Sequence, residues 1–140
     1  MTKLAKLDAL TVAAVAFMAA NLLHTADHQR QGTERLTTEI YAGGTAITLM
    51  AIGTLVLVLR RHPRAPLIAA VVGLWSGLGV TASHIAPHWS AFSDSYGSGQ
   101  DALSWIIVAG EIGTAFVLGL NGMLALRRSR SGHAPATAAG

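Results

Sequence analysis

The sequence predicts an all-α protein, an integral membrane four-helix bundle of up-down topology with both termini in the cytoplasm. Three observations support this fold class. The 140 residues are 51% hydrophobic and 12% charged, with a mean hydropathy of +0.46, whereas about a quarter of the residues in soluble domains are charged. The apolar residues form four separate stretches. The basic residues cluster in the short segments on one side of these stretches.

Each stretch is long enough for a membrane-spanning helix, which needs about 20 mostly apolar residues. We expect spans at about 7–28, 40–59, 66–86 and 101–126. The third begins at Pro66, a residue suited to the first helical turn. The fourth carries one charged residue in its interior, Glu111. All four are rich in Ala, Gly and Leu and lack the alternation of barrel strands.

The distribution of basic residues predicts the orientation of the spans. Eight of the ten Lys and Arg residues belong to the segments on one side: Lys3, Lys6, Arg60, Arg61, Arg64, Arg127, Arg128 and Arg130. The opposite connections carry Arg30 and Arg35 together with five acids: Asp27, Glu34, Glu39, Asp94 and Asp101. Positive charge marks the cytoplasmic side, so we expect a multi-pass protein of the cytoplasmic (inner) cell membrane.

Composition also limits the organisation and the partners of the chain. Residues 1–128 are predicted to form one four-span domain, and residues 129–140 a disordered tail. The absence of cysteine excludes disulfides and thiolate metal sites. Because the basic residues flank apolar runs, we expect membrane lipid and no nucleic acid as partners. The composition is also compatible with a homo-oligomer.

Histidines are the most informative residues. Four of the six form two His-x-x-x-His pairs, His24 with His28 and His84 with His88, each at the outer end of a span. Residues four apart share a helix face and lie about 6 Å from each other. Counted from the cytoplasmic boundaries, His24 and His84 both lie about 27–29 Å along their helices, with Glu111 about one turn lower. The second pair is less regular, because Pro87 disfavours a helix before His88.

Polar residues around these pairs predict a site inside the bundle. Asn21, His24, Asp27, His28 and Gln31 form a polar stripe along the end of the first span. Such a stripe is costly to expose to lipid and is expected to face the interior or a wet cavity. Glu39 adds a carboxylate from the second span. His62 belongs to a basic segment and His133 to the tail, so neither is expected to act in the site.

Three functions are compatible with these residues. The first is a membrane-embedded, metal-dependent enzyme, with redox chemistry on a small or lipophilic substrate at a site open to the extracytoplasmic side. Its iron, copper or zinc ligands would be His24, His28, His84, His88 and Glu39, which suit such ions. Glu111 would be the catalytic proton donor or acceptor, supported by Asp27.

The second function is a small b-type cytochrome, with His24 and His84 as the axial ligands of haem b. The third is non-catalytic: a transporter subunit, a metal carrier or a membrane scaffold. Glycines in the last three spans fit two interpretations, close helix contact or room for a flat cofactor. They include Gly43, Gly44, Gly53, Gly73, Gly77, Gly79, Gly110, Gly113 and Gly119.

Overall fold

The computed structural model describes residues 8–131, and all regular structure in this range is helical. The elements are α1 (Ala9–Gln31), a 3₁₀ turn η1 (Thr33–Arg35), α2 (Thr38–Leu59), α3 (Ala65–His84) and α4 (Ala102–Ser131). Among the described residues there are four α-helices and no strand, which confirms the all-α prediction. All four are long and apolar enough to cross a membrane.

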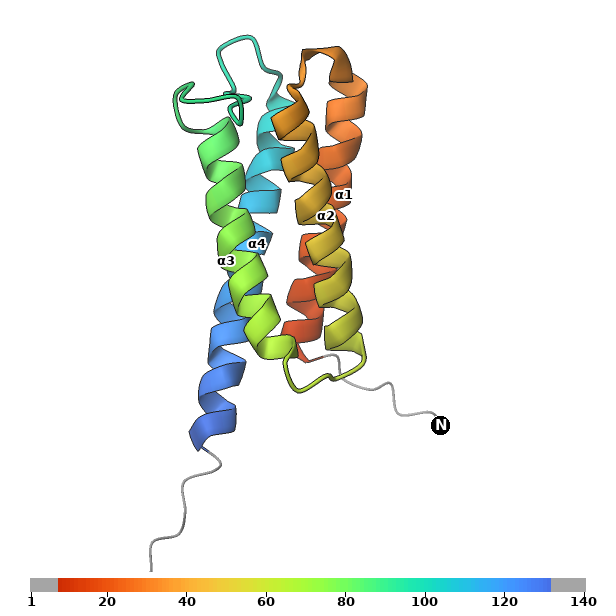
Figure 1. The fold of residues 1–140 in the computed structure, drawn as a ribbon, viewed down its shortest axis with the longest axis vertical. Helices are drawn as coiled ribbons and strands as arrows, with labels where there is room; N and C mark the ends of the chain where they lie inside the picture. The colour runs from red at the N-terminus through yellow and green to blue at the C-terminus, as the bar shows by residue number, and fades with distance from the viewer. Residues whose placement is uncertain (1–7, 132–140) are drawn as a thin grey trace, which may run out of the picture.

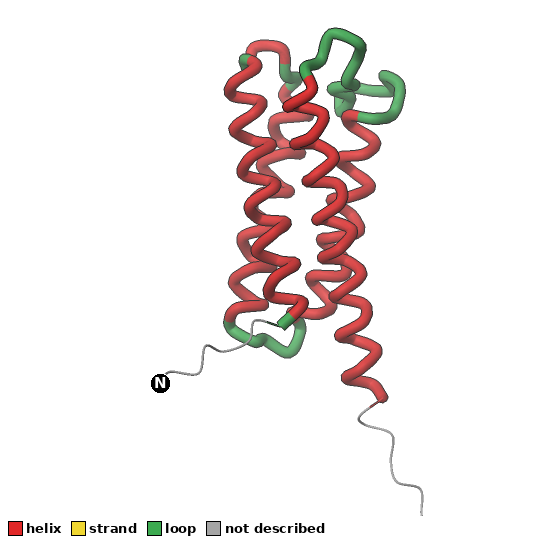
Figure 2. Tube along the Cα trace, turned by 180° about the vertical axis from the view of Figure 1, so that it is seen from behind, coloured by secondary structure: helices red, strands yellow, loops and turns green. Residues whose placement is uncertain are grey.

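The helices lie side by side along one axis (Figure 1). The connections 32–37 and 85–101 lie at one end, and the turn 60–64 lies at the other, where α4 extends beyond its neighbours (Figures 1 and 2). Around the bundle, α1 packs against α2, α2 against α3, α3 against α4 and α4 against α1. Consequently α1, which carries His24 and His28, and α3, which ends at His84, face each other diagonally.

Local chemistry explains where the helices begin. The carboxylate of Asp8 accepts a hydrogen bond from the backbone N–H of Thr11 at 2.8 Å and so caps α1. Asp101 does the same at α4, accepting from the N–H of Ser104 at 2.8 Å. Pro66 occupies the first turn of α3, where its missing N–H costs nothing.

The helix ends differ from the predicted spans by a few residues. Helix α3 ends at His84 rather than at residue 86, because Pro87 cannot continue the helix and restricts the residue before it. Helix α4 runs on to Ser131, so the segment expected to be a disordered tail begins inside its last turn. Residues 132–140 lie outside the described range.

Small residues bring α3 and α4 close together. A side chain at Gly73 would meet the carbonyl oxygen of Ala115 at 2.6 Å, and one at Gly119 would meet the backbone nitrogen of Leu74 at 2.9 Å. A Cβ at Gly77 would meet the ring of Phe116 at 3.0 Å. Close helix contact, the first interpretation of the glycines, is therefore confirmed for this pair of helices.

That interpretation is wrong for the other glycines singled out from the sequence. No described atom lies within 4 Å of the position a Cβ would take at Gly44, Gly53, Gly79, Gly110 or Gly113. At Gly43 the nearest such atom is Cδ1 of Phe92, at 4.0 Å. These residues face open space, because their helix faces do not meet a neighbouring helix.

Candidate metal centre

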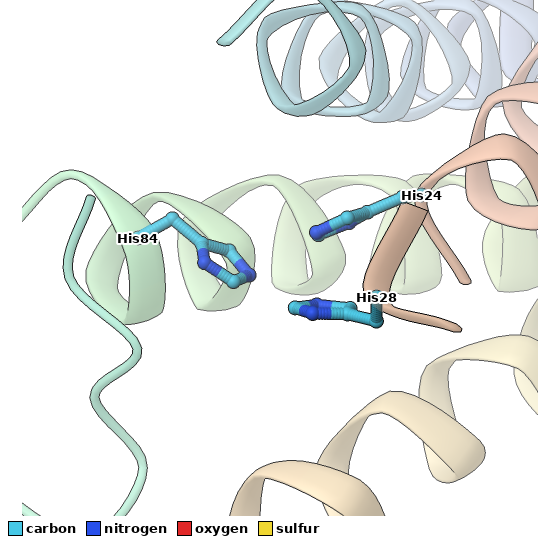
Figure 3. A group of neighbouring side chains, drawn as sticks. All are labelled: His24, His28 and His84. Atoms are coloured by element: carbon cyan, nitrogen blue, oxygen red, sulfur yellow. The ribbon is translucent and has the colours of Figure 1, made fainter. Parts of the chain in front are cut away.

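His24, His28 and His84 converge at the end of the bundle that carries the longer connections. Helix α1 supplies His24 and His28 one turn apart, and α3 supplies His84 as its last residue. Their rings point toward one another across the diagonal of the bundle (Figure 3). His24 is 6% exposed and His84 is 4% exposed, while His28 is half-buried. These residues are called the histidine cluster below.

The spacing of the rings is close to what one metal ion requires. The centroid of the His24 ring lies 4.6 Å from that of His28 and 4.7 Å from that of His84. One nitrogen from each ring lies within 4.8 Å of the others, and the described structure could hold a metal ion there. Two nitrogens on one tetrahedral ion at about 2.0–2.1 Å are about 3.3 Å apart. A bound ion would therefore draw the nitrogens closer together than the 4.8 Å limit within which they lie.

A polar network from the other helices holds His24 in place. Nδ1 of His24 is hydrogen-bonded to Oε2 of Glu111 on α4. The second carboxylate oxygen, Oε1, accepts from the amide of Asn21 at 2.8 Å. The amide oxygen of Asn21 in turn accepts from the hydroxyl of Thr48 on α2 at 2.9 Å. Glu111 is 1% exposed and Asn21 is 4% exposed, so the network links α1, α2 and α4 in the interior.

This network leaves one nitrogen of His24 unused. Oε1 of Glu111 accepts from Asn21, and an ionised Glu111 also accepts from Nδ1 of His24 at Oε2. In the neutral ring, Nε2 of His24 then keeps its lone pair. Nε2 is buried and has no hydrogen-bond partner among the described residues. A buried nitrogen without a partner is costly in a folded protein. A carboxylate on one ring nitrogen and a metal ion on the other is the usual arrangement of a metal-binding histidine.

His84 is oriented in the same way by the connection that follows it. Its Nδ1 donates to the backbone carbonyl oxygen of Asp94 at 3.0 Å, which leaves Nε2 as the nitrogen with a free lone pair. The carboxylate of Asp94 lies 3.7 Å from Nδ1 of His84 and 3.8 Å from Nδ1 of His28. Asp94 thus faces two rings of the cluster. In the sequence Asp94 is only one of five acids in the connections on this side, because nothing in a loop sequence indicates such a contact.

Tyr96 completes this side of the site. Its ring centroid lies 4.8 Å from that of His84 and 5.4 Å from that of Trp105. Burial raises the pKa of the Tyr96 phenol to about 12. Tyr96 was not singled out in the sequence, because no local pattern places a residue of this connection against His84.

Asp27 lies apart from the cluster and joins α1 to the start of α4. Its carboxylate lies 2.7 Å from the guanidinium of Arg30 and accepts from the amide of Gln31 at 2.6 Å. Arg30 also pairs with Asp101 at 2.8 Å and donates to the hydroxyl of Ser104 at 2.9 Å. The Ser104 N–H and then Arg30 lower the pKa of Asp101. The contacts of Asp27 are those of a structural ion pair.

Two further residues predicted as ligands are not brought to the cluster. Glu39 lies in the first turn of α2 and is exposed. His88 is also exposed and follows Pro87 in the connection after α3. Among the described residues, the candidate metal group contains neither of them. His62 lies at the opposite end of the bundle, in the turn 60–64, and His133 lies outside the described range.

A cavity of about 720 Å³ adjoins the cluster. Its walls come from the ends of α1, α2 and α3 nearest the cluster, with Trp89 and Phe92 from the following connection. His24, His28, His84, Asn21 and Glu111 line one part of it, and most of the remaining wall is aliphatic or aromatic. The volume falls within the range of small-molecule sites, about 300–1,000 Å³.

Comparison with protein-family models, with curated proteins and with solved structures gives no match for this chain. Function must therefore be argued from the site alone. Its imidazoles suit iron, copper or zinc, and a set of three leaves a position for a further ligand.

Proposed function

We propose that the chain is a multi-pass membrane protein that binds one transition-metal ion at the histidine cluster. We further propose that the bound ion performs redox chemistry on a small or lipophilic substrate in the adjoining cavity. In this proposal the protein is a membrane-embedded, metal-dependent oxidoreductase whose site opens to the extracytoplasmic side.

One observation carries the metal proposal. His24 is held at Nδ1 by Glu111, while its Nε2 is buried without a partner beside His28 and His84. A merely structural histidine in the core uses both nitrogens or turns the free one to water. Metal coordination accounts for the buried lone pair, for the carboxylate behind it and for the convergence of the three rings.

The enzymatic part of the proposal rests on the surroundings of the cluster. Three imidazoles leave an open coordination position, which catalytic metal sites use for water or substrate. Iron or copper at that position would supply one-electron chemistry. Glu111 is hydrogen-bonded to His24, so we propose that it tunes the ligand rather than meeting the substrate. The cavity offers a water-poor space next to the open position.

The ring geometry favours a single metal ion over haem b. Two histidines on opposite faces of one haem need about 6 Å between ring centroids, from two iron–nitrogen bonds of about 2 Å and the radius of each ring. The centroids of His24 and His84 are 4.7 Å apart. No layer remains between them for a porphyrin.

We propose an up-down path across the inner cell membrane with both termini on the cytoplasmic side. The turn 60–64, the start of α1 and the far end of α4 lie at one end of the bundle (Figure 1). That end carries Arg60, Arg61, Arg64, Arg127 and Arg128. Basic residues favour the cytoplasmic side, so the histidine cluster is assigned to the outer half of the membrane.

The test is elemental analysis with an ultraviolet-visible spectrum on protein purified in mild detergent. We expect about one iron or copper ion per chain without a Soret band, lost in His24→Ala and in His84→Ala. A zinc ion instead would keep the metal site but reject the redox chemistry, because zinc has no redox activity. His62→Ala, at the opposite end, serves as the matched control and should retain the ion. A Soret band that is lost in the same variants would indicate a haem site instead of the proposed metal centre. Protein that stays metal-free after reconstitution would reject both of these sites and favour a carrier or scaffold role.

A further inference from the structure

The glycines that line the cavity have no packing role in the bundle. Gly43 and Gly44 on α2 and Gly79 on α3 all contribute to the cavity wall. A Cβ at Gly44 or Gly79 would meet no described atom within 4 Å apart from the backbone of its own helix turn. Glycine costs a helix about 1 kcal/mol relative to alanine, and no close helix approach explains it here. What these residues do is leave space in front of the cluster.

The cavity has an apolar body and one polar end. Along its length the wall is built from side chains such as Ile40, Ile47, Met50, Trp75 and Leu78. Thr45 and Thr48 also line it. The hydroxyl of Thr45 donates to the carbonyl of Tyr41, and that of Thr48 is shared between Asn21 and the carbonyl of Gly44. Other polar side chains of the wall, such as Gln29 and Ser83, lie close in the chain to His28 and His84, so the polar end of the cavity is the end at the cluster.

The same cavity reaches the outer surface of the bundle between α2 and α3. Leu49, Trp75 and Leu78 line it and are also 64%, 70% and 59% exposed. In a chain that spans a membrane, this surface meets the hydrocarbon of the bilayer. Helix α2 is the least enclosed of the spans. Of its most apolar 18-residue segment 17% is buried, against 44% for α3. A molecule dissolved in the bilayer would have direct access to the cavity.

We propose that the cavity binds a bilayer-soluble amphiphile, with an apolar chain along α2 and α3 and one oxygen-bearing head group at the histidine cluster. The apolar chain of the occupant enters sideways from the membrane, and its head group lies at the end of the site that is nearest the extracytoplasmic side. This inference rests on the proposed function, because the metal ion there provides the open position for the head-group oxygen. The cavity volume of about 720 Å³ lies within the range of sites that bind small molecules.

The experiment uses palmitic acid that carries a photoreactive diazirine in its chain, added to the full-length protein in lipid nanodiscs. After illumination, the labelled residues are mapped by mass spectrometry. We expect labels on the cavity faces of α2 and α3, for example at Thr48 and at Val80, which is buried. Gly44→Leu and Gly79→Leu fill the cavity and should reduce these labels about tenfold.

Two control variants add the same side chain away from the cavity. Gly53 on α2 and Gly113 on α4 also have no described atom within 4 Å of a Cβ, and neither lines the cavity. Gly53→Leu and Gly113→Leu should leave the labelling unchanged. Labels confined to outward faces of the helices, with equal yield in all four variants, would overturn the proposal.

Metal content measured on the same samples separates the two proposals. Bound metal retained in Gly44→Leu and Gly79→Leu shows that those variants are folded and that the loss of label is due to the filled cavity. A second outcome is a wild-type protein that holds no metal but is labelled in the cavity, with the label lost in Gly44→Leu and Gly79→Leu. That result would sustain the amphiphile site and reject the metal centre. Bound metal without cavity labelling would reject the amphiphile site alone.

Discussion

Glu111 on α4 is hydrogen-bonded to Nδ1 of His24 on α1, although the two residues are 87 positions apart in the chain. The other oxygen of the same carboxylate is occupied by Asn21. A facing helix therefore determines which nitrogen of His24 carries its proton. The nitrogen that remains is the one available to a metal ion.

Glu111→Gln should weaken metal binding about 10–100-fold, the usual cost of removing the partner of a metal-binding histidine. Asn21 and His24 both donate to the carboxylate, whereas a glutamine side chain has one acceptor oxygen. Its amide group would favour the proton on Nε2 of His24 and so block the ligand atom. Competition titration with a chromophoric chelator measures the change. Glu39→Gln, an exposed carboxylate at the same end, is the control, and equal affinities for both variants would contradict this role.

Metal loading should raise the stability of the bundle. The ligands come from α1 and α3, which lie diagonally across it, so an ion that binds only the folded chain links these helices. At a free concentration of about 100 times its Kd, such an ion raises the free energy of unfolding by about 2.7 kcal/mol. Thermal unfolding followed by circular dichroism, with zinc and then with excess chelator, measures the gain. His84→Ala should abolish the response and His62→Ala should keep it; a response retained in His84→Ala would point to another site.

Much of the fold could be predicted from the sequence, because a span is a local property of about 20 apolar residues. The position of each helix follows from hydropathy and from residues such as Pro66 and Pro87. The pairing of His24 with His28 follows from helical periodicity alone. Even the approach of His84 to them depends only on the equal depth of His24 and His84 along two helices that face each other diagonally in the bundle.

Other parts of the site depend on contacts that no local pattern encodes. The bond from His84 to the carbonyl of Asp94 requires the path of an irregular connection. Asp27 has the same spacing on α1 as the residues of the site, but Arg30 and the start of α4 take up its carboxylate. The role of each glycine depends on which face of its helix meets a neighbour.

Tyr96 should ionise only at strongly alkaline pH. Burial raises its pKa from 10.0 to about 12, so the folded state favours the neutral phenol. The stabilisation is complete below pH 10 and is lost as the pH rises toward the folded-state pKa of about 12. Absorbance at the tyrosinate band, recorded for the wild type and Tyr96→Phe, gives the titration of this residue by difference. A difference curve centred near the ordinary tyrosine value would show that the phenol is open to water.

Gly73→Ala should destabilise the bundle by about 1–3 kcal/mol, the usual cost of overpacking a tight contact. The added carbon would lie 2.6 Å from the carbonyl oxygen of Ala115 and 2.8 Å from Cα of Gly119, and backbone cannot rotate away as a flexible side chain would. Helices α3 and α4 must then separate along their closest contact.

Gly113→Ala provides the comparison, because its Cβ would meet no described atom within 4 Å. It should leave stability unchanged or raise it by at most about 1 kcal/mol through helix propensity. Unfolding by increasing amounts of sodium dodecyl sulfate, followed by circular dichroism, measures both variants. Gly73 is eleven residues from His84, about 16 Å along α3, so the folded fraction of Gly73→Ala should still bind metal. Equal midpoints for the two variants would mean that α3 and α4 pack less closely than their glycines indicate.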